Sequence, residues 1–399
     1  MAARSSSSSP RPYQLIVFGA SGFTGRFVVE EVARSSAEVP GGKLTWAIAG
    51  RSRDKLEKVL QETADQLGKP ELQSEVEIIV ADVSEPDSLA AMCKLGQVIL
   101  TCVGPYRFYG EPVVKACVEN GAHCVDISGE PQFLESMQLN YDSAAADGGV
   151  YIVGSCGFDS IPADMGCIHD GTWQSAVYGM ADSEKLKSLR KQLNPKPLPV
   201  IGAKIKRRSA LFYSNEIQQY AVPFMGSDPS VVKRTQRFLS EEQQTPVQYG
   251  AYAGVGGISS VIKLLFAAFI FSLFVKFSFG RNLLIKFPEF FSFGYFSKKG
   301  PTRKQMEGSS FCFAFFGEGY TEGQDPSQGK PNAKIRTLVR GPEAGYVATP
   351  IAMVQAALTI LSEPDALPKK GGVYTPGAVF AKTSLIERLD KHGIHFSVL

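Results

Sequence analysis

The sequence predicts an α/β protein with a parallel, doubly wound sheet, and three observations lead to this fold class. Short apolar segments alternate with amphipathic segments between Tyr13 and Ser155, which is the pattern of strands joined by crossover helices. Three glycines, Gly19, Gly22 and Gly25, directly follow the first apolar segment, LIVF. An amphipathic segment starts near Phe23, so the glycines lie in a turn between a strand and a helix.

The turn Gly19–Gly25 predicts a Rossmann-type dinucleotide site. In such a turn the first glycine permits a tight bend, the second lets the backbone approach a pyrophosphate, and the third lets helix and strand pack closely. Amides at the helix start and the helix dipole favour the phosphates. A purely structural turn is the alternative. The predicted cofactor contacts in this turn are Gly19, Ser21, Gly22, Phe23, Thr24 and Gly25.

The second predicted strand, Leu44–Ala49, ends just before Arg51. In folds of this type an acidic residue at that place accepts from a free ribose 2′-hydroxyl, whereas a basic residue suits a 2′-phosphate. Arg51, followed closely by Arg53 and Lys55, therefore favours NADP over NAD, and NAD stays open as a cofactor. The alternative is that these basic side chains are only the solvated start of a helix.

The other strands of this region are predicted to end at the same edge of the sheet, because parallel strands share that edge. They are Val76–Ala81, Val98–Val103, His123–Ile127 and Val150–Val153, and the predicted helices are Arg53–Leu67, Pro112–Glu119 and Pro131–Asp147. Asp82 follows the third strand and is predicted to meet the adenine. Gly104 and Pro105 follow the fourth strand, where a nicotinamide ring would lie.

A reduction also needs a proton source beside the cofactor. Tyr106, Asp126, Glu130 and Asp159 lie at predicted strand ends or just after them. Each could instead be a helix cap or a hydrogen-bond anchor, and no Tyr-x-x-x-Lys pair occupies the usual place of a donor in this fold. We take Tyr106, Asp126 and Asp159 as the catalytic candidates.

The composition limits the kind of protein this is. A chain of 399 residues suggests two or three domains, and a net charge of +3 gives no argument for binding nucleic acid. The cysteines and histidines show no metal-ligand spacing, so we expect no metal site and buried thiols in a reducing compartment. The serine run and the prolines of residues 1–12 indicate a disordered tail, and this stretch lacks the apolar core of a secretory signal peptide.

The alternating pattern ends near residue 160 and defines the predicted domains. A dinucleotide-binding domain over 13–160 is followed by a second α+β domain over 161–344. The C-terminal segment, 345–399, is predicted to return and pack on the first domain. It contains an apolar helix at Ile351–Leu361, a Gly-Gly-Val-Tyr-Thr-Pro turn, a helix at Ser384–His392 and a strand at Ile394–Val398.

The most apolar part of the chain is Leu264–Val275, which lies between Lys263 and Lys276 within a predicted membrane-contact segment, 258–297. This uncharged run is shorter than the roughly twenty residues that a bilayer crossing needs. We therefore predict a contact in the plane of a membrane surface, with lysines at the ends of the run. A buried core or dimer helix is the alternative, so a homodimer stays open. The upstream cluster Lys204, Lys206, Arg207 and Arg208 either meets lipid headgroups or is a solvated face.

Seven motifs together resemble the saccharopine dehydrogenase family: GASGFTG, AGRSRDKL, CVGPYRFYGEPVVKAC, DISGEPQF, GFDSIPAD, GPEAGYVATPIAMVQAAL and GGVYTPGAVF. The resemblance covers nearly the whole chain, and the family also has relatives among bacterial trans-acting enoyl reductases of lipid synthesis. It implies a Rossmann domain, a second α+β domain inserted before the C-terminus and, for animal members, association with lipid droplets or membranes.

The chain departs from the family pattern at one place. About thirty residues that the family carries are missing between Cys167 and Ile168, as in a splice variant or a gene-model deletion, and such a loss would leave strand edges of the second domain unpaired. We therefore expect the deletion to affect folding of the second domain before that of the first.

The sequence as a whole predicts an NADP-dependent oxidoreductase that acts on an unsaturated, carbonyl-bearing or imine substrate of lipid character. We expect it at a lipid droplet or membrane surface, on the cytosolic side. Two alternatives stay open: a non-catalytic nucleotide-binding scaffold on lipid droplets, and a saccharopine dehydrogenase. The sequence does not identify the arginines that would hold the carboxylates of saccharopine.

Overall fold

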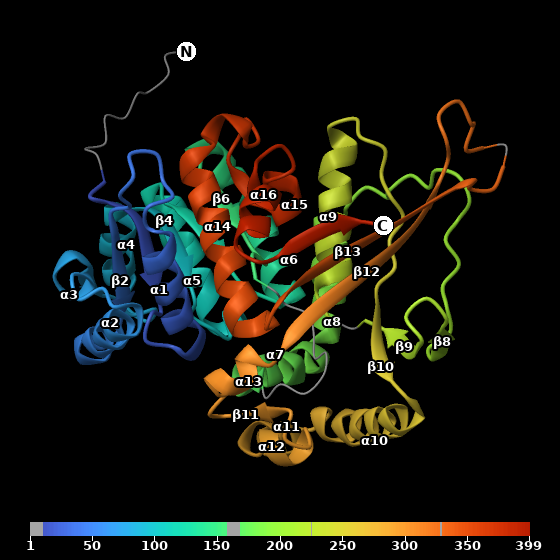
Figure 1. The fold of residues 1–399 in the computed structure, drawn as a ribbon, viewed down its shortest axis with the longest axis horizontal. Helices are drawn as coiled ribbons and strands as arrows, with labels where there is room; N and C mark the ends of the chain where they lie inside the picture. The colour runs from blue at the N-terminus through green and yellow to red at the C-terminus, as the bar shows by residue number, and fades with distance from the viewer. Residues whose placement is uncertain (1–10, 158–167, 225, 328) are drawn as a thin grey trace.

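The structure is a computed structural model that describes residues 11–157, 168–224, 226–327 and 329–399, with the backbone alone at 168–171. Asp159 and Cys167 lie outside the described residues, and so does one side of the junction at which the family pattern is interrupted. In Figure 1 the N-terminal part of the chain forms a sheet covered by helices on the left. A long hairpin and a small sheet extend to the right, and a layer of helices lies at the bottom.

A parallel sheet of seven strands organises the N-terminal part, in the order β14-β6-β5-β4-β1-β2-β3. The strands are β1 (Tyr13–Phe18), β2 (Trp46–Gly50), β3 (Glu77–Val80), β4 (Gly96–Thr101), β5 (His123–Asp126), β6 (Tyr151–Val153) and β14 (Gly372–Tyr374). The strand order reverses between β1 and β4, which are hydrogen-bonded neighbours. This is the doubly wound, Rossmann-type topology, so the predicted fold class is confirmed.

Helices cover both faces of this sheet. The helices α1 (Phe23–Ser35), α2 (Arg53–Leu67) and α14 (Thr349–Ser362) pack on one face, and α4 (Pro86–Leu95), α5 (Tyr106–Asn120) and α6 (Pro131–Gly148) pack on the other. Leu15 and Val17 of β1 belong to the first core and Ile16 and Phe18 to the second. The central strand is therefore apolar on both sides, which explains the continuous run LIVF.

Two elements of this region differ from the sequence expectation. The helix expected from Pro112 begins at Tyr106 instead, because the Glu130 carboxylate accepts hydrogen bonds from the first-turn amides of Tyr106 (2.9 Å) and Arg107 (3.3 Å). The expected Gly-Gly-Val-Tyr-Thr-Pro turn contains strand β14, which pairs with β6. The amide of Val373 in this strand donates to Asp142 over 2.8 Å. The C-terminal segment thus returns to the first sheet, as predicted.

The rest of the chain is a mixture of helices and small sheets, and its predicted boundaries at residues 160 and 344 stay predictions. A two-stranded parallel pair joins β7 (Ile168–His169) to β11 (Phe296–Ser297). The antiparallel strands β8 (Phe212–Ser214), β9 (Gln219–Pro223) and β10 (Tyr252–Gly256) form one sheet, and β12 (Ser310–Gly319), β13 (Ala333–Pro342) and β15 (His395–Val398) form another. Before the apolar segment the helices of this part are α7 (Asp170–Ala181), α8 (Ser183–Leu193) and α9 (Asp228–Glu241).

The apolar segment folds into a layer of three helices below the rest of the molecule in Figure 1. They are α10 (Ile258–Val275), α11 (Ser278–Lys286) and α12 (Pro288–Phe291). Trp173 and Val177 of α7 pack with Val275 and Leu284 to form the small core that attaches this layer. The helix α10 begins at Ile258, six residues before the uncharged run Leu264–Val275, and Gly257 is its N-cap residue.

Two helical segments among the described residues are long and apolar enough to cross a membrane by length and composition. The segment Ala344–Ser362, which contains α14, is 72% buried inside the protein, as expected for a core helix. The helix α10 has a mean hydropathy of 2.3 and is only 11% buried. Burial in the core therefore explains why the first segment is apolar. Packing within the described chain does not explain why α10 is apolar.

Candidate cofactor site

The glycine turn lies at the edge of the sheet where the strands end. Gly19 has a positive φ of +83°, which favours glycine, and its amide donates to the carbonyl of Ala49 in β2 over 2.9 Å. The amide of Gly22 closes the turn by donating to the Gly19 carbonyl over 2.9 Å. A Cβ on Gly19 would lie 2.8 Å from Val103, so the turn also packs tightly against the loop after β4.

The three glycines are needed for different reasons. A Cβ on Gly25 would lie 2.1 Å from the Gly19 carbonyl oxygen, so this glycine lets α1 pack on its own turn. Gly22 has an extended backbone, and its Cβ would meet only the Gly19 oxygen at 3.1 Å. Packing within the protein therefore explains Gly19 and Gly25 better than Gly22. A pyrophosphate approaching the exposed backbone of Gly22 supplies the missing reason, so this turn fits a dinucleotide.

The first turn of α1 suits an anion. Gly22 is the N-cap and provides no side-chain cap, and the first turn carries no acidic residue. The positive end of the helix dipole lies here, beside the exposed residues Ser21 and Gly22. The predicted contacts Phe23 and Thr24 begin this helix.

Arg51 and Asp82 lie at the same edge, after β2 and β3. Arg51 is exposed and has no ion-pair partner among the described residues. The Asp82 carboxylate accepts from the amide (2.9 Å) and hydroxyl (2.7 Å) of Ser84, and these hydrogen bonds, with a smaller contribution from Arg51, lower the pKa of Asp82. Because β1, β2 and β3 are neighbours, the structure brings the glycine turn, Arg51 and Asp82 to one edge of the sheet.

The predicted nicotinamide loop follows β4, next to β1. Its residue Gly104 is exposed and Pro105 precedes the first residue of α5. The amide of Cys102 donates to the carbonyl of Phe18 over 2.9 Å, which fixes the loop beside the glycine turn. Gly104 and Pro105 therefore lie beside the turn, as the strand order requires.

The contacts of Tyr106 favour a structural role. Its ring is buried, and its hydroxyl donates to the Thr101 carbonyl over 2.7 Å and accepts weakly from the Ile127 amide over 3.4 Å. Burial raises the pKa of Tyr106 well above its usual value, and Asp126 raises it further. A hydroxyl held in this way ties β4 to the loop after β5 and does not face the exposed edge of the sheet.

Asp126 ends β5 and is also buried. One carboxylate oxygen accepts from the amides of Ser128 (2.8 Å) and Ser155 (3.1 Å). Burial raises the pKa of Asp126 to about 6, although these hydrogen bonds and the nearby Arg234 act in the opposite direction. A raised pKa favours general acid or base catalysis, but Asp126, like Tyr106, is buried and held by hydrogen bonds within the protein. The role of Asp159 stays a prediction.

Sequence reasoning missed the ion-pair network at the start of α5. Arg107 donates to Glu130 over 2.8 Å and to Asp182, between α7 and α8, over 2.9 Å. Ser175 of α7 donates to the same Glu130 carboxylate over 3.0 Å. Glu130, considered as an acid or base from its position, is therefore engaged in joining α5 to α7. No sequence signal pairs these residues, because they are distant along the chain.

Comparison with known proteins identifies the family. Residues 15–153 match the family model of the saccharopine dehydrogenase NADP binding domain. The chain is 58% identical over 419 residues to a saccharopine dehydrogenase-like oxidoreductase of Homo sapiens, covering 98% of each chain. The chain belongs to the saccharopine dehydrogenase-like oxidoreductase family. Membership of this family makes it an oxidoreductase, and the part of the chain that matches the family model binds NADP.

Two further similarities bear on the fold and on location. Among solved structures, a saccharopine dehydrogenase (L-Glu forming) from Saccharomyces cerevisiae covers 97% of this chain and 100% of its own, with a TM-score of 0.50 and 11% identity, which supports the fold alone. A Caenorhabditis elegans relative called lipid droplet localized protein is 37% identical, covering 97% of this chain and 98% of its own. The family resemblance and the NADP cofactor predicted from the sequence are confirmed.

Proposed function

We propose that this family member transfers a hydride between NADP and an unsaturated, carbonyl-bearing or imine substrate of lipid character, while bound to a membrane or lipid-droplet surface. The observation that carries the proposal is an exposed apolar surface on α10–α12, attached to a domain that binds NADP. The lipid-droplet name of the nematode relative supports the same location.

The helices α10, α11 and α12 expose many large apolar side chains close to one another. Phe279 and Phe290 are 74% and 76% exposed, and they extend the apolar face of α10. Soluble monomers rarely expose such continuous apolar patches unless the patch is an interaction site. Its exposed members are Ile258, Ile262, Leu264, Leu265, Phe266, Phe269, Leu273, Phe277, Phe279, Phe287, Phe290, Phe293 and Tyr295. We call this set the apolar layer surface.

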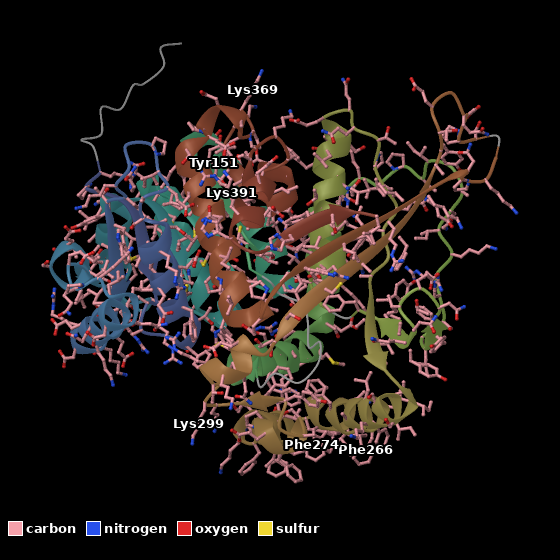
Figure 2. The ribbon with its side chains drawn as sticks, viewed as in Figure 1. Tyr151, Phe266, Phe274, Lys299, Lys369 and Lys391 are labelled. Carbon is pink, nitrogen blue, oxygen red and sulfur yellow. The ribbon has the colours of Figure 1, made fainter. Side chains whose placement is uncertain are left out.

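Basic residues accompany the apolar layer surface. Lys263, Lys276, Lys286, Lys298 and Lys299 are exposed within or next to the three helices. Each basic residue near an anionic membrane surface contributes about 1 kcal/mol of binding free energy. Figure 2 shows Phe266, Phe274 and Lys299 on the same lower part of the molecule. A surface that combines exposed apolar and basic side chains suits a lipid monolayer with anionic headgroups.

The residues at the edge of the sheet have different proposed roles in binding NADP and in proton transfer. NADP supplies the hydride chemistry, and the protein positions the reactants. We assign Gly22 and the first turn of α1 to the pyrophosphate and Arg51 to the 2′-phosphate. Asp126 and Tyr106 both stay candidates for the acid or base, and each is buried and held by hydrogen bonds.

One observation favours a second function, a nucleotide-binding scaffold without turnover. Tyr106 and Glu130 are both engaged in hydrogen bonds that tie structural elements together. A scaffold would bind NADPH at a membrane surface and consume none of it. Saccharopine oxidation is the other outcome to test, since saccharopine dehydrogenase names the family.

A binding and turnover experiment tests these functions together. NADPH and NADH are titrated by nicotinamide fluorescence against the native protein and Arg51→Gln. We expect NADPH to bind more tightly than NADH and Arg51→Gln to remove the difference. Lipid aldehydes, imines, enoyl thioesters and saccharopine are then screened with vesicles present. Reproducible cofactor turnover with a lipid substrate supports the proposal, turnover with saccharopine replaces it, and binding without any turnover supports the scaffold.

A further inference from the structure

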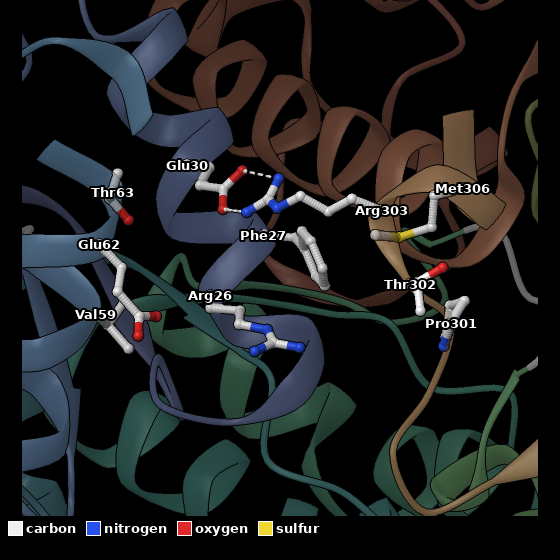
Figure 3. A pocket seen from close by; sticks show the side chains of 10 residues that line it. All are labelled: Arg26, Phe27, Glu30, Val59, Glu62, Thr63, Pro301, Thr302, Arg303 and Met306. Atoms are coloured by element: carbon white, nitrogen blue, oxygen red, sulfur yellow. Dashed lines mark hydrogen bonds and ion pairs between the residues drawn. The ribbon is translucent and has the colours of Figure 1, made fainter. Parts of the chain in front are cut away.

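A cavity lies away from the predicted nicotinamide loop, and no residue of that loop lines it. Residues of α1, α2 and the segment 301–306 line it, it is partly open to solvent, and its volume is about 400 Å³ (Figure 3). Small-molecule sites measure roughly 300–1,000 Å³, so a space of this size can hold more than a few water molecules. Phe27, Val59 and Met306 line it with apolar side chains. None of these residues belongs to the predicted cofactor contacts or to the apolar layer surface.

Arg26 provides a cation in the cavity, and it forms no ion pair with any of the described residues. Its guanidinium lies over the rings of Phe23 and Phe27, at 4.5 and 5.1 Å from the ring centroids. Its Nε is buried and lacks a hydrogen-bond partner among the described residues. No hydrogen bond or ion pair of the guanidinium is described, so Arg26 lines the cavity as a cation that no anion neutralises. The other arginine of the cavity, Arg303, is already engaged by Glu30 over 2.6 Å, as Figure 3 shows.

Glu62 provides an anion on another wall of the same cavity. It is exposed, and its described ion pair is with the solvent-facing Lys58 over 3.7 Å, a contact of little energetic value. Arg26 and Glu62 both line the cavity without forming an ion pair with each other. The hydroxyl-bearing Thr63, which is almost fully buried, lines the wall beside Glu62. The cavity therefore offers separate sites for a negative and a positive group.

We propose that this cavity binds a small zwitterion, with its oxyanion on Arg26 and its primary ammonium on Glu62. A simple anion would meet the carboxylates of Glu62 and Glu30, and a simple cation would meet Arg26 and Arg303. A primary ammonium has the N–H donors that Glu62 and the Thr63 hydroxyl can accept. The apolar body of the ligand lies against Phe27, Val59 and Met306. The oxyanion is a carboxylate in an apolar amino acid or a phosphate in a phosphoethanolamine group.

Calorimetric titration of the full chain without NADP tests the site independently of the oxidoreductase activity. The probes are leucine, O-phosphoethanolamine, inorganic phosphate alone and ethanolamine alone. We expect a zwitterion to bind at least roughly tenfold more tightly than either single-charge probe. Tighter binding of O-phosphoethanolamine identifies the oxyanion as phosphate, and tighter binding of leucine identifies it as carboxylate.

Two cavity variants and one control locate the binding. Arg26→Gln and Glu62→Gln should each weaken zwitterion binding by roughly tenfold to a hundredfold. Glu57→Gln, which changes an exposed carboxylate of α2 outside the cavity lining, should leave zwitterion binding unchanged. Glu62 is exposed, so its variant keeps the test valid if Arg26→Gln fails to fold. Absence of binding by all probes overturns the proposal. So does equal binding of phosphate or ethanolamine alone, or unchanged affinity in both cavity variants.

Discussion

Ser175 on α7 donates a hydrogen bond to the Glu130 carboxylate over 3.0 Å, and this contact joins the helix beneath the cofactor domain to the start of α5. The same carboxylate caps the first amides of α5, and Arg107 links it to Asp182. The other side of α7 carries Trp173, which packs in the core of the apolar layer. One helix thus connects the nicotinamide loop to the surface that we assign to lipid.

Arg107→Ala should destabilise the protein strongly. Arg107 and Glu130 form an ion pair whose side chains are 8% and 2% exposed. Removing the arginine leaves a buried carboxylate without its partner, which costs about 3–5 kcal/mol of the free energy of unfolding. Urea denaturation measures this loss. Lys115→Ala is the control, because Lys115 pairs with Glu119 at the surface over 3.9 Å and should change stability by less than about 1 kcal/mol. Equal effects of the two substitutions would contradict a central role for Glu130.

The same substitution at two glycines should separate cofactor binding from folding. Gly22→Ala should fold with nearly native thermal stability and lose NADPH affinity, because its Cβ meets one protein atom at 3.1 Å and otherwise points to the exposed edge. Gly25→Ala should lose about 1–3 kcal/mol or more of stability, because its Cβ would overlap the Gly19 oxygen at 2.1 Å. Thermal melting and NADPH fluorescence titration measure the two effects. If Gly22→Ala binds NADPH normally, the pyrophosphate does not lie against this glycine.

The sequence predicts the first sheet well because its strands are buried on both faces. Runs such as LIVF and the helix Arg53–Leu67 carry strong local signals, and the structure has that helix over the same residues. The glycine turn and Arg51 could be located for the same reason, since each directly follows a strand. Their roles at the cofactor stay predictions, which rest on the order of the elements.

Side-chain direction and long-range partners could not be predicted. Tyr106 follows the fourth strand, but its hydroxyl turns inward to the Thr101 carbonyl. Glu130 is the N-cap residue of α6, and its carboxylate accepts hydrogen bonds from the first amides of α5. This contact explains why α5 starts well before Pro112. Arg26 of α1 lines a cavity because the distant segment 301–306 forms another of its walls. Each of these depends on residues far apart in sequence, which periodicity does not relate.

Asp126→Asn should make stability less dependent on pH between about 4 and 6. The pKa of Asp126 in the folded protein is about 6 because the carboxyl is buried, whereas an unfolded aspartate titrates near 3.9. The folded state therefore holds this proton more tightly. Stability from this group is fully present below pH of about 4 and is lost as the pH rises through about 6. The asparagine retains an oxygen for the Ser128 and Ser155 amides and removes this titration.

Urea denaturation at several pH values measures the effect of Asp126→Asn. The stability of the variant relative to the native protein should rise by on the order of 2–3 kcal/mol between pH 4 and pH 7. Asp65→Asn, at an exposed residue of α2, should show no such rise. A constant difference between Asp126→Asn and the native protein at all pH values would show that Asp126 titrates outside this range. It would then be unsuited to proton transfer near neutral pH.

The apolar layer surface should lose its affinity for lipid when carboxylates are introduced on α10. Leu265→Asp with Phe269→Asp should abolish binding to lipid, because the two side chains are 56% and 58% exposed on α10 and would place carboxylates in the hydrocarbon. Burying a leucine or phenylalanine side chain contributes about 1.5–3 kcal/mol, so losing two such contacts weakens binding by orders of magnitude. Flotation with anionic liposomes and with oil-filled droplets measures the bound fraction.

A matched double variant distinguishes this surface from general apolar exposure. Ile335→Asp with Phe316→Asp changes two comparably exposed apolar residues on the β12–β13 hairpin, outside the apolar layer surface. This variant should float like the native protein, and both double variants should bind NADPH, because neither pair touches the glycine turn. Suppose that Leu265→Asp with Phe269→Asp stays folded, binds NADPH and floats normally. Then α10 is covered by another protein surface, such as a second copy of the chain, and the membrane assignment fails.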